Sequence, residues 1–111
     1  MAFGRLSGKY IDKKDKPSDR VDKFSRMSRY SSSNSLEATK RYYDIAKENG
    51  WSMAQMSLAW VNQQPFLTST IIGATDLDQL KENIDSINLE IPKEVIKKIN
   101  AVHEEIPNPA P

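Results

Sequence analysis

Apolar residues recur at helical spacing in the middle of the chain and predict two adjacent helices there. The first is expected over residues 36–49, with Asn34 and Glu37 as a capping pair and Gly50 as a left-handed stop. Its apolar side holds Leu36, Tyr43, and Ala46 or Ile45.

A second helix is predicted from residue 53 to residue 64. Ser52 and Gln55 form a capping pair before it, and Pro65 closes it. Its apolar side chains are expected to pack in the core: Met53, Met56, Ala59 and Trp60. A last helix is predicted from Pro92, ahead of a non-helical tail at 106–111, and its inward side chains are Val95, Ile96, Ile99 and Val102.

The stretch FLTSTII, residues 66–72, is β-branched and almost continuously apolar, which predicts a short buried strand. Gly73 follows it, and a helix is predicted at about residues 77–87, with Thr75 and Asp78 as a capping box. Four apolar residues of this helix are expected to face the core: Leu77, Leu80, Ile84 and Ile87.

The beginning of the chain predicts a different organisation. Residues 1–10 are interpreted as the end of a strand that runs into a loop, and the polar, charge-alternating residues 11–35 as a long functional loop or flap. One full strand cannot form a sheet, so the apolar helix faces require a partner that this sequence does not contain. The expected fold class is therefore α/β, and the abrupt start favours a truncated chain.

Composition excludes several classes of function. The chain has 111 residues, fewer than the roughly 250 of a complete α/β barrel. Its net charge of +1 creates no global field for nucleic acid or an anionic membrane. It has no cysteine, so disulfides and thiolate chemistry are excluded and a reducing cytosol is expected. Neither a bilayer-spanning run nor a signal-peptide core is present in the sequence.

Three polar residues after Gly73 form a stripe on the predicted helix: Gln79, Glu82 and Asn83. The stripe borders the expected apolar face, where a side chain can be held still and still reach a ligand. A glycine between strand and helix, with free N–H groups behind it, favours an anion or nucleotide. From spacing alone, an ordinary strand–turn–helix with a solvated stripe is the alternative, and both stay open.

Four stretches in order, AFGRLSGKY, FSRMSRYS, AQMSLAWV and IIGATDLDQLKENI, together resemble the C-terminal portion of an NADP(H)-dependent aldo-keto reductase. The similarity extends over essentially all 111 residues and favours the Tas-like and potassium-channel β-subunit-like branches. The resemblance implies the last part of a (β/α)8 TIM barrel: the end of strand seven, the helix pair, strand eight and two closing helices. Residues 10–35 would then be the loop that covers the cofactor.

The resemblance also implies which residues bind NADP(H). Gly73 and Thr75 match turn residues that hold the phosphate of the adenosine ribose. Gln79 and Glu82 match residues that bracket the adenosine, and Asn83 matches the residue that hydrogen-bonds the adenine.

Three further cofactor contacts are implied in the covering loop: Lys9 of the GKY sequence, Phe24, and Arg26 of the aromatic–Ser–Arg motif. Ala2 and Phe3 fall where the strand on the nicotinamide side ends. Many family members have an arginine soon after the glycine to hold the 2′-phosphate, whereas this chain has Thr75-Asp76. Either the preference for the 2′-phosphate is weaker, or Arg26 and Lys9 take that role.

No catalytic or metal-binding residue is assigned. The resemblance implies a tyrosine acid with aspartate, lysine and histidine partners, all from strands that precede this segment. His103 is expected at the surface, and the four tyrosines are expected in packing or surface roles: Tyr10, Tyr30, Tyr42 and Tyr43. The isolated chain is accordingly expected neither to turn over substrate nor to fold robustly.

The implied function is hydride transfer between NADP(H) and an aldehyde or ketone in the cytoplasm. The expected partner is a small carbonyl substrate, with no nucleic acid or membrane, and a homo-oligomer of the full-length protein stays open. A non-catalytic NADP-binding regulatory subunit, like the channel β subunits, stays open. The outline of a DNA-binding helix-turn-helix, with Gly50 at the turn, is disfavoured because residues 53–64 contain no lysine or arginine.

Overall fold

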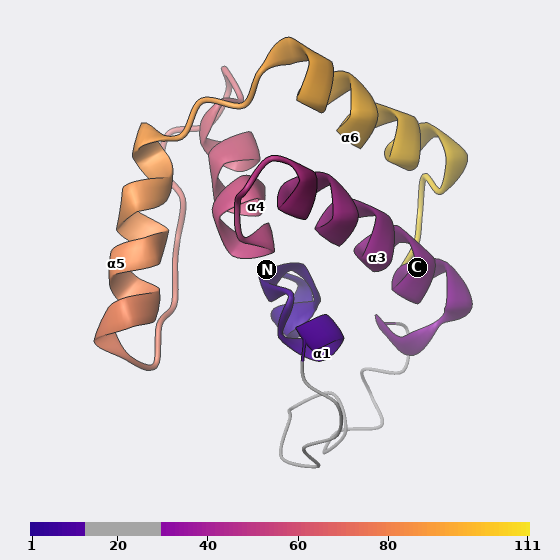
Figure 1. Ribbon diagram of the computed structural model, residues 1–111, viewed down its shortest axis with the longest axis horizontal. Helices are drawn as coiled ribbons and strands as arrows, with labels where there is room; N and C mark the ends of the chain where they lie inside the picture. Colours follow the sequence, from indigo (N-terminus) through magenta and orange to yellow (C-terminus); the bar gives the residue numbers. More distant parts are fainter. Residues whose placement is uncertain (13–29) are drawn as a thin grey trace.

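The computed structural model describes residues 1–12 and 30–111. Within these ranges every regular element is a helix, and Figure 1 shows their arrangement. In chain order they are η1 (Ala2–Ser7), α1 (Lys9–Asp12), α3 (Ser33–Glu48), α4 (Met53–Asn62), α5 (Leu77–Asp85), η3 (Ser86–Asn88) and α6 (Lys93–Glu105). None of the helices in the described ranges has the length and apolar character needed to span a bilayer.

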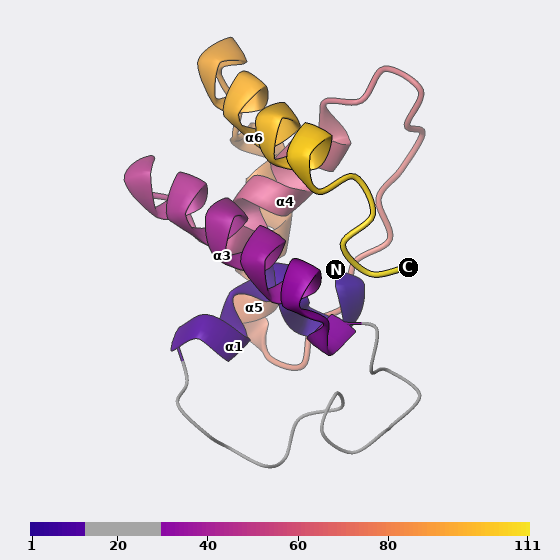
Figure 2. The ribbon, with the colours of Figure 1, turned by 90° about the vertical axis from the view of Figure 1, so that its right-hand side faces the viewer.

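Helices α3, α4 and α6 form a small bundle around one core. Figures 1 and 2 show α3 and α6 side by side in opposite directions. Two surface ion pairs join them, Arg41 to Glu105 at 2.6 Å and Lys98 to Glu48 at 2.8 Å. The buried side chains come from all three helices and from the segment before α6: Ala38, Ile45, Ala46, Met53, Met56, Ala59, Ile91, Val95, Ile99 and Val102.

The first helix of the predicted pair begins earlier than expected. Its N-cap is Ser32, whose Oγ accepts a hydrogen bond from the Ser35 N–H at 3.2 Å, so the predicted capping pair of Asn34 and Glu37 is wrong. Leu36 is exposed rather than packed. The other predicted core positions are confirmed, since Ile45 and Ala46 are buried and Tyr43 packs against the core.

The turn and the second helix agree closely with the prediction. Gly50 has a φ of +73°, the left-handed conformation expected of a helix stop. The Ser52 Oγ accepts from the Gln55 N–H at 3.0 Å, and the Gln55 Oε1 accepts from the Ser52 N–H at 3.1 Å. This capping box is confirmed, although α4 ends at Asn62, somewhat before Pro65.

The predicted strand end at residues 1–10 is wrong. These residues form η1 and α1, with Gly8 in the left-handed conformation between them. Local bonds satisfy the backbone, for example from the Gly4 N–H to the Met1 carbonyl at 2.9 Å. A strand needs a neighbour to pair with, and the described part of the chain offers none. The predicted loop is also shorter at both ends, because residues 11–12 belong to α1 and residues 33–35 to α3; residues 13–29 lie outside the described part.

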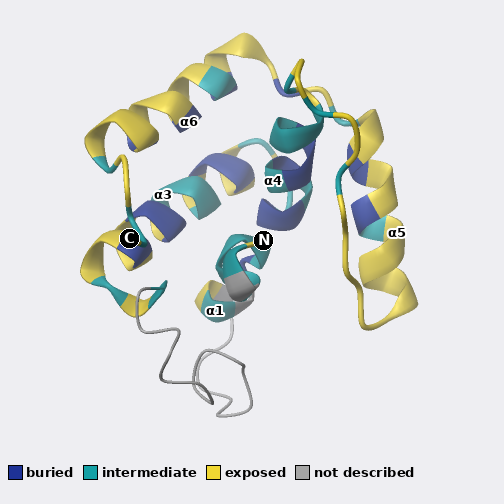
Figure 3. Cartoon of the chain, turned by 180° about the vertical axis from the view of Figure 1, so that it is seen from behind, coloured by how far each residue is buried: buried dark blue, intermediate teal, exposed yellow. Residues whose placement is uncertain are grey.

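The predicted buried strand at residues 66–72 is likewise not formed. The segment has no strand assignment and is largely exposed, with Ile71 at 97% exposure. It runs back alongside α5, as Figures 1 and 3 show, and Figure 3 colours most of it as exposed. β-branched residues favour a strand only where a neighbouring strand and apolar layers receive them.

The two later helices form where the sequence predicts them. Helix α5 with η3 covers the predicted residues 77–87, and α6 begins directly after Pro92. Of its predicted inward residues, Val95, Ile99 and Val102 are buried and Ile96 is partly buried against the core. The expected core face of α5 is wrong, however, because Leu77, Leu80, Ile84 and Ile87 are all exposed. The elements of a barrel sheet are therefore not formed in the described part of this chain.

Candidate functional site

The turn that leads into α5 is built on Asp76. The Asp76 Oδ1 accepts a hydrogen bond from the Gln79 N–H at 2.8 Å and so caps the helix. The capping box predicted between Thr75 and Asp78 is therefore wrong. The helix starts at Leu77, so the residue placed to reach the third helical N–H is Asp76 and not Thr75.

Gln79 joins the turn to the helix. Its side-chain Oε1 accepts from the Thr75 N–H at 3.2 Å and from the Thr75 hydroxyl at 3.1 Å. One turn further along α5, the Asn83 Nδ2 donates to the Gly73 carbonyl at 3.2 Å. Four of the residues predicted to bind the cofactor are thus brought together in a network of two hydrogen-bonded pairs at one turn, Thr75 with Gln79 and Gly73 with Asn83.

Burial separates the members of the predicted stripe. Asn83 is only 7% exposed, Glu82 is half-buried and Gln79 is exposed. Asn83 is buried because its side-chain amide reaches across to the backbone of the preceding segment. Its carboxamide also presents an acceptor and a second N–H, the pair of groups needed for an adenine edge.

Gly73 leaves open space at the turn. A Cβ added there would meet nothing within 4 Å, and the φ of Gly73 is outside the left-handed region. Neither the backbone conformation nor a neighbour in the described part of the chain requires a glycine. The space is therefore open to a group that approaches the backbone from outside, as a phosphate would.

The N–H groups at the start of α5 are only partly open to an anion. Those of Thr75 and Gln79 are engaged by the side chains of Gln79 and Asp76. By helix geometry, the N–H groups of Leu77 and Asp78 have no intrahelical acceptor. The Asp76 carboxylate adds a negative charge at this end, which opposes a second anion.

A groove of about 520 Å³ lies behind this turn, between α4, residues 67–72 and the α5–η3 pair. Asn83, Ile72 and Ile87 contribute to its lining. The Thr70 hydroxyl donates to the Asn62 Oδ1 at 2.6 Å and ties the segment to the end of α4. The turn is therefore held at two places, by Thr70 on one side and by Asn83 on the other.

Four predicted cofactor residues are not part of this network, and one of them, Glu82, is half-buried on α5. Phe24 and Arg26 lie outside the described residues. The backbone of Lys9 lies in α1, and its side chain is outside the described part of the structure, as is that of Phe3. Ala2 begins η1 and has a φ of +47°.

Arg5 is a candidate functional residue that was not predicted from the sequence. Its guanidinium lies 4.8 Å from the centre of the Tyr10 ring and donates to the Ser31 hydroxyl at 3.1 Å. Its buried Nε makes no hydrogen bond within the described residues. The signal in the sequence is a single cation among apolar and small residues, three positions before the start of the GKY sequence.

The side chains that could suggest catalysis lie at several places in the described part of the chain. His103 is exposed on α6, as expected. Tyr42 is half-buried, and burial raises the pKa of its phenol, so it stays protonated. Arg5 lies over the ring of Tyr10, and Lys47 lies 5.9 Å from the ring centre of Tyr43. In the described ranges no group of three or more acidic, histidine or cysteine side chains could hold a metal ion.

Comparison with known proteins identifies the family. The chain belongs to the aldo/keto reductase family, whose model matches residues 1–104. This family has a (β/α)8 barrel fold, generally uses NAD(P)H and includes oxidoreductases.

Three relatives show the range of the similarity. The chain is 45% identical to Protein tas of Escherichia coli over 111 residues, all of this chain and 32% of that protein. It is 35% identical over 114 residues to a probable voltage-gated potassium channel subunit beta of Oryza sativa, covering 96% of this chain and 34% of that protein. It is 32% identical over 99 residues to L-glyceraldehyde 3-phosphate reductase of E. coli, covering 79% and 27%. The chain thus spans about one third of the length of the relatives it matches.

Proposed function

We propose that this chain is the C-terminal, cofactor-binding portion of an NADP(H)-dependent aldo-keto reductase that acts in the cytoplasm. The complete protein would transfer a hydride between NADP(H) and an aldehyde or ketone. The observation that supports this most directly is the hydrogen-bonded turn that joins Gly73 and Thr75 to Gln79 and Asn83 of α5.

In this proposal each member of the turn has its own task. Gly73 leaves room for a phosphate beside the backbone, and Thr75, two residues further along the turn, would offer its hydroxyl to that phosphate. The buried amide of Asn83 is held by the Gly73 carbonyl and meets the adenine edge. Gln79 and Glu82 lie on the same side of α5 and bracket the adenosine.

The covering loop completes the site. Arg26 supplies a planar fork for a phosphate and Lys9 a point charge, while Phe24 offers a flat face to the adenine or ribose. The Asp76 carboxylate accepts a hydrogen bond from the Gln79 N–H at the start of α5. Its negative charge repels a 2′-phosphate. The selectivity for NADPH over NADH therefore depends on Arg26 and Lys9.

The chemical step is assigned to residues outside this chain. A bound nicotinamide cofactor supplies the hydride, and the proton donor is the tyrosine of a Tyr, Asp, Lys and His set on the other barrel strands. This chain orients the adenosine end and excludes water there. The 111-residue chain alone is expected to be inactive.

A chimera tests the proposal, with this chain in place of the matching third of E. coli Tas. NADPH binding is followed by the fluorescence of the nicotinamide, and reduction is followed with a panel of small aldehydes. Gln79→Ala and Asn83→Ala should each weaken NADPH binding about tenfold, the loss of about one hydrogen bond to the ligand. Because Gln79 is exposed, its removal leaves the core intact.

Lys81→Ala is the matched control, because Lys81 is also exposed on α5 but lies outside the network. Equal affinity in all three variants would refute the adenosine site at this turn. Arg26→Ala should lower the preference for NADPH over NADH, whereas an unchanged ratio would remove the 2′-phosphate role from Arg26.

A second candidate is a non-catalytic NADP-binding regulatory subunit. The similarity to the plant channel subunit favours it. The chimera separates the two candidates only in part, so the complete natural protein must be assayed. Binding of NADPH without reduction of any aldehyde in the panel, together with capture of a channel protein, would favour the regulatory subunit.

A further inference from the structure

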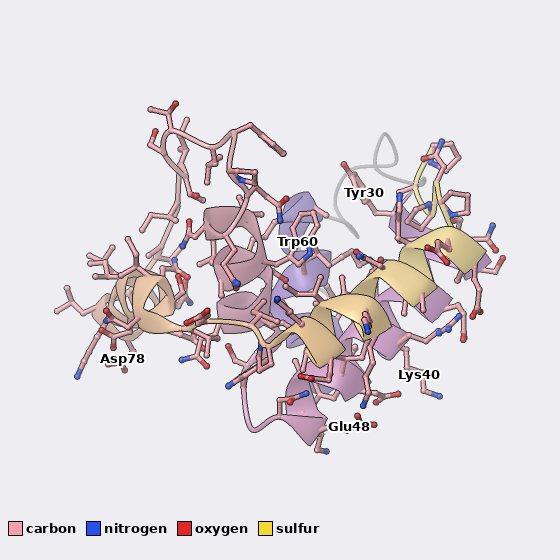
Figure 4. All side chains as sticks on the ribbon, turned by 90° about the horizontal axis from the view of Figure 1, so that it is seen from above. Tyr30, Lys40, Glu48, Trp60 and Asp78 are labelled. Atoms are coloured by element: carbon pink, nitrogen blue, oxygen red, sulfur yellow. The ribbon has the colours of Figure 1, made fainter. Side chains whose placement is uncertain are left out.

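Arg5 joins two parts of the described chain that are far apart in sequence. It lies in η1, and its guanidinium stands over the Tyr10 ring of α1, 4.8 Å from the ring centre. The same guanidinium donates to the Ser31 hydroxyl at 3.1 Å, next to the start of α3. Figure 4 shows Tyr30, the neighbour of Ser31, at the end of α3 away from Glu48. One side chain therefore links η1, α1 and the N-terminal end of α3.

Helix α1 depends on such contacts, because it consists of only four residues, Lys9–Asp12. A single helical turn is not stable on its own and must be held by the rest of the fold. Its N-terminal end packs closely on the bundle, since a Cβ added to Gly8 would lie 3.6 Å from the Tyr43 ring. Further along α1, Arg5 contacts the ring of Tyr10.

Stability alone does not explain an arginine at this position. The buried Nε of Arg5 makes no hydrogen bond within the described residues. A buried donor without an acceptor costs free energy, so an uncharged side chain of similar length would suit the fold equally well. Helix α1, which Arg5 contacts, also contains the backbone of Lys9. The proposed function assigns Lys9 to a phosphate of the cofactor.

We infer that Arg5 is a positioning residue for NADP(H), which fixes α1, and with it the backbone of Lys9, between η1 and the start of α3. This inference rests on the proposed function. A cation whose backbone is already ordered binds a phosphate more tightly than one that must be ordered on binding, because less entropy is lost. In this role Arg5 stays with Tyr10 and Ser31 and does not contact the cofactor.

Substitution of Arg5 in the complete natural protein tests this role. Arg5→Met keeps the length of the side chain and removes its charge and its donors. NADPH binding should weaken about five- to tenfold, since a cation–π contact and one hydrogen bond are lost. The melting temperature should change little, because removal of the buried, unpartnered Nε offsets the two lost contacts. Hydride transfer at saturating NADPH should change by less than about twofold, as expected when only binding is affected.

A double substitution shows whether Arg5 acts through Lys9. Lys9→Ala alone should weaken NADPH binding. Arg5→Met should cause little further loss in the Lys9→Ala protein, because the residue that Arg5 positions no longer carries a charge. Fully additive losses would mean that Arg5 binds the cofactor independently of Lys9, and they would overturn the inference.

Two further variants provide the test if Arg5→Met folds poorly. Arg5→Lys retains a cation for the Tyr10 ring and should recover part of the lost affinity. Ser31→Ala removes only the acceptor and should weaken NADPH binding about twofold. Lys47→Met is the matched control, because Lys47 also lies near a tyrosine ring, 5.9 Å from the centre of Tyr43, but in the last turn of α3. It should leave NADPH binding unchanged, and a loss equal to that of Arg5→Met would overturn the inference.

NADPH binding by the variants separates this inference from the proposed function. If Gln79→Ala weakens binding and Arg5→Met does not, the positioning role is refuted and the cofactor site stands. If Arg5→Met weakens binding and neither Gln79→Ala nor Asn83→Ala does, the positioning role stands and the adenosine site at the α5 turn is refuted. Parallel losses of affinity and melting temperature in Arg5→Met would show a purely structural role. An unchanged protein that binds no NADPH would refute the proposed function and the inference together.

Discussion

The α3–α4–α6 bundle and the segment at residues 66–87 have equally clear hydrophobic patterns and opposite outcomes. In the bundle, apolar residues at helical spacing are buried, as Ala46, Ala59 and Val102 illustrate. In residues 66–87, Leu77 lies at its predicted helical spacing and Ile71 in its predicted apolar run, and both remain exposed. A hydrophobic pattern therefore identifies a face that must be buried. Whether another element is present to bury it depends on the rest of the fold.

The difference in burial depends on whether the partner of each apolar face lies within this chain. Helices α3 and α4 are consecutive, and α6 returns antiparallel to α3, so the three faces close on one another within this chain. A strand such as residues 66–72 needs neighbours on both sides and an apolar layer on both faces. The described residues supply neither, and the segment stays unpaired.

The largest expected effect on stability comes from a substitution in the core of the α3–α4–α6 bundle. Met53→Ala should lower the free energy of unfolding by about 2–4 kcal/mol, because Met53 is only 2% exposed and its removal leaves a cavity. Leu77→Ala should change it by no more than about 0.5 kcal/mol, since the side chain is mostly solvated. Urea unfolding followed by circular dichroism measures both. Equal effects would mean that residues 66–87 have a core of their own.

Substitutions of Gly50 and Gly73 provide the second test of the difference between the bundle and residues 66–87. Gly50→Ala should cost about 1–2 kcal/mol, because the φ of +73° is unfavourable for an L side chain even though the added Cβ has space. Gly73→Ala should leave the free energy of unfolding within about 0.5 kcal/mol, since its φ is ordinary and its Cβ would lie in the open. In the Tas chimera, the same change should weaken NADPH binding. Loss of stability at Gly73 would show that the glycine has a structural role.

The helix caps are expected to have smaller and unequal effects. Ser52→Ala should lower the free energy of unfolding by about 1 kcal/mol, because the capping box orders the start of the bundle helix α4. Asp76→Ala should leave the main urea transition in place and reduce only the helical signal of α5, because Leu77, Leu80 and Ile84 of this helix are already exposed. Ser33→Ala, an exposed change beside another cap, is the control. A matching shift for Asp76→Ala would mean that α5 unfolds together with the bundle.

The sequence predicts the bundle well because its signals are local. The Ser52–Gln55 capping box, the Gly50 stop and the inward residues of α6 each depend on chain neighbours a few positions away. Cap positions were missed where two polar residues compete, as Ser32 with Asn34 and Asp76 with Thr75. The strand predictions failed because a strand forms only where neighbouring strands are present to hydrogen-bond with it.

The candidate site was predictable in part for the same reason. Helical spacing and the family resemblance together pointed to Gly73, Thr75, Gln79 and Asn83, which the structure joins by hydrogen bonds. The engagement of Asp76 with the helix N–H could not be foreseen, since it depends on where the helix starts. Arg5 was overlooked because its partners, Tyr10 and Ser31, are not adjacent to it in sequence.

The smallest expected effect concerns the ion pair that joins α3 to α6. The Arg41 guanidinium hydrogen-bonds the Glu105 carboxylate and lowers its pKa below the ordinary value of 4.5. A carboxyl group with a lowered pKa in the folded state stabilises the fold above its unfolded pKa. This contribution is lost as the pH falls from about 4.5 through the lowered value. Because both groups are at the surface, the contribution is small and screened by salt.

Glu105→Gln should therefore reduce stability slightly near neutral pH and make no difference once the pH lies well below 4.5. Glu104→Gln removes the same charge from the neighbouring exposed residue and is the control. Urea midpoints for the two variants and the unchanged protein, measured across this pH range at low and high salt, report the difference. A gap between Glu105→Gln and the unchanged protein that persists at low pH would mean that packing, and not charge, joins the ends of α3 and α6. The stability of the α3–α4–α6 bundle would then not depend on this ion pair. The difference between the bundle and residues 66–87 would come from apolar burial alone.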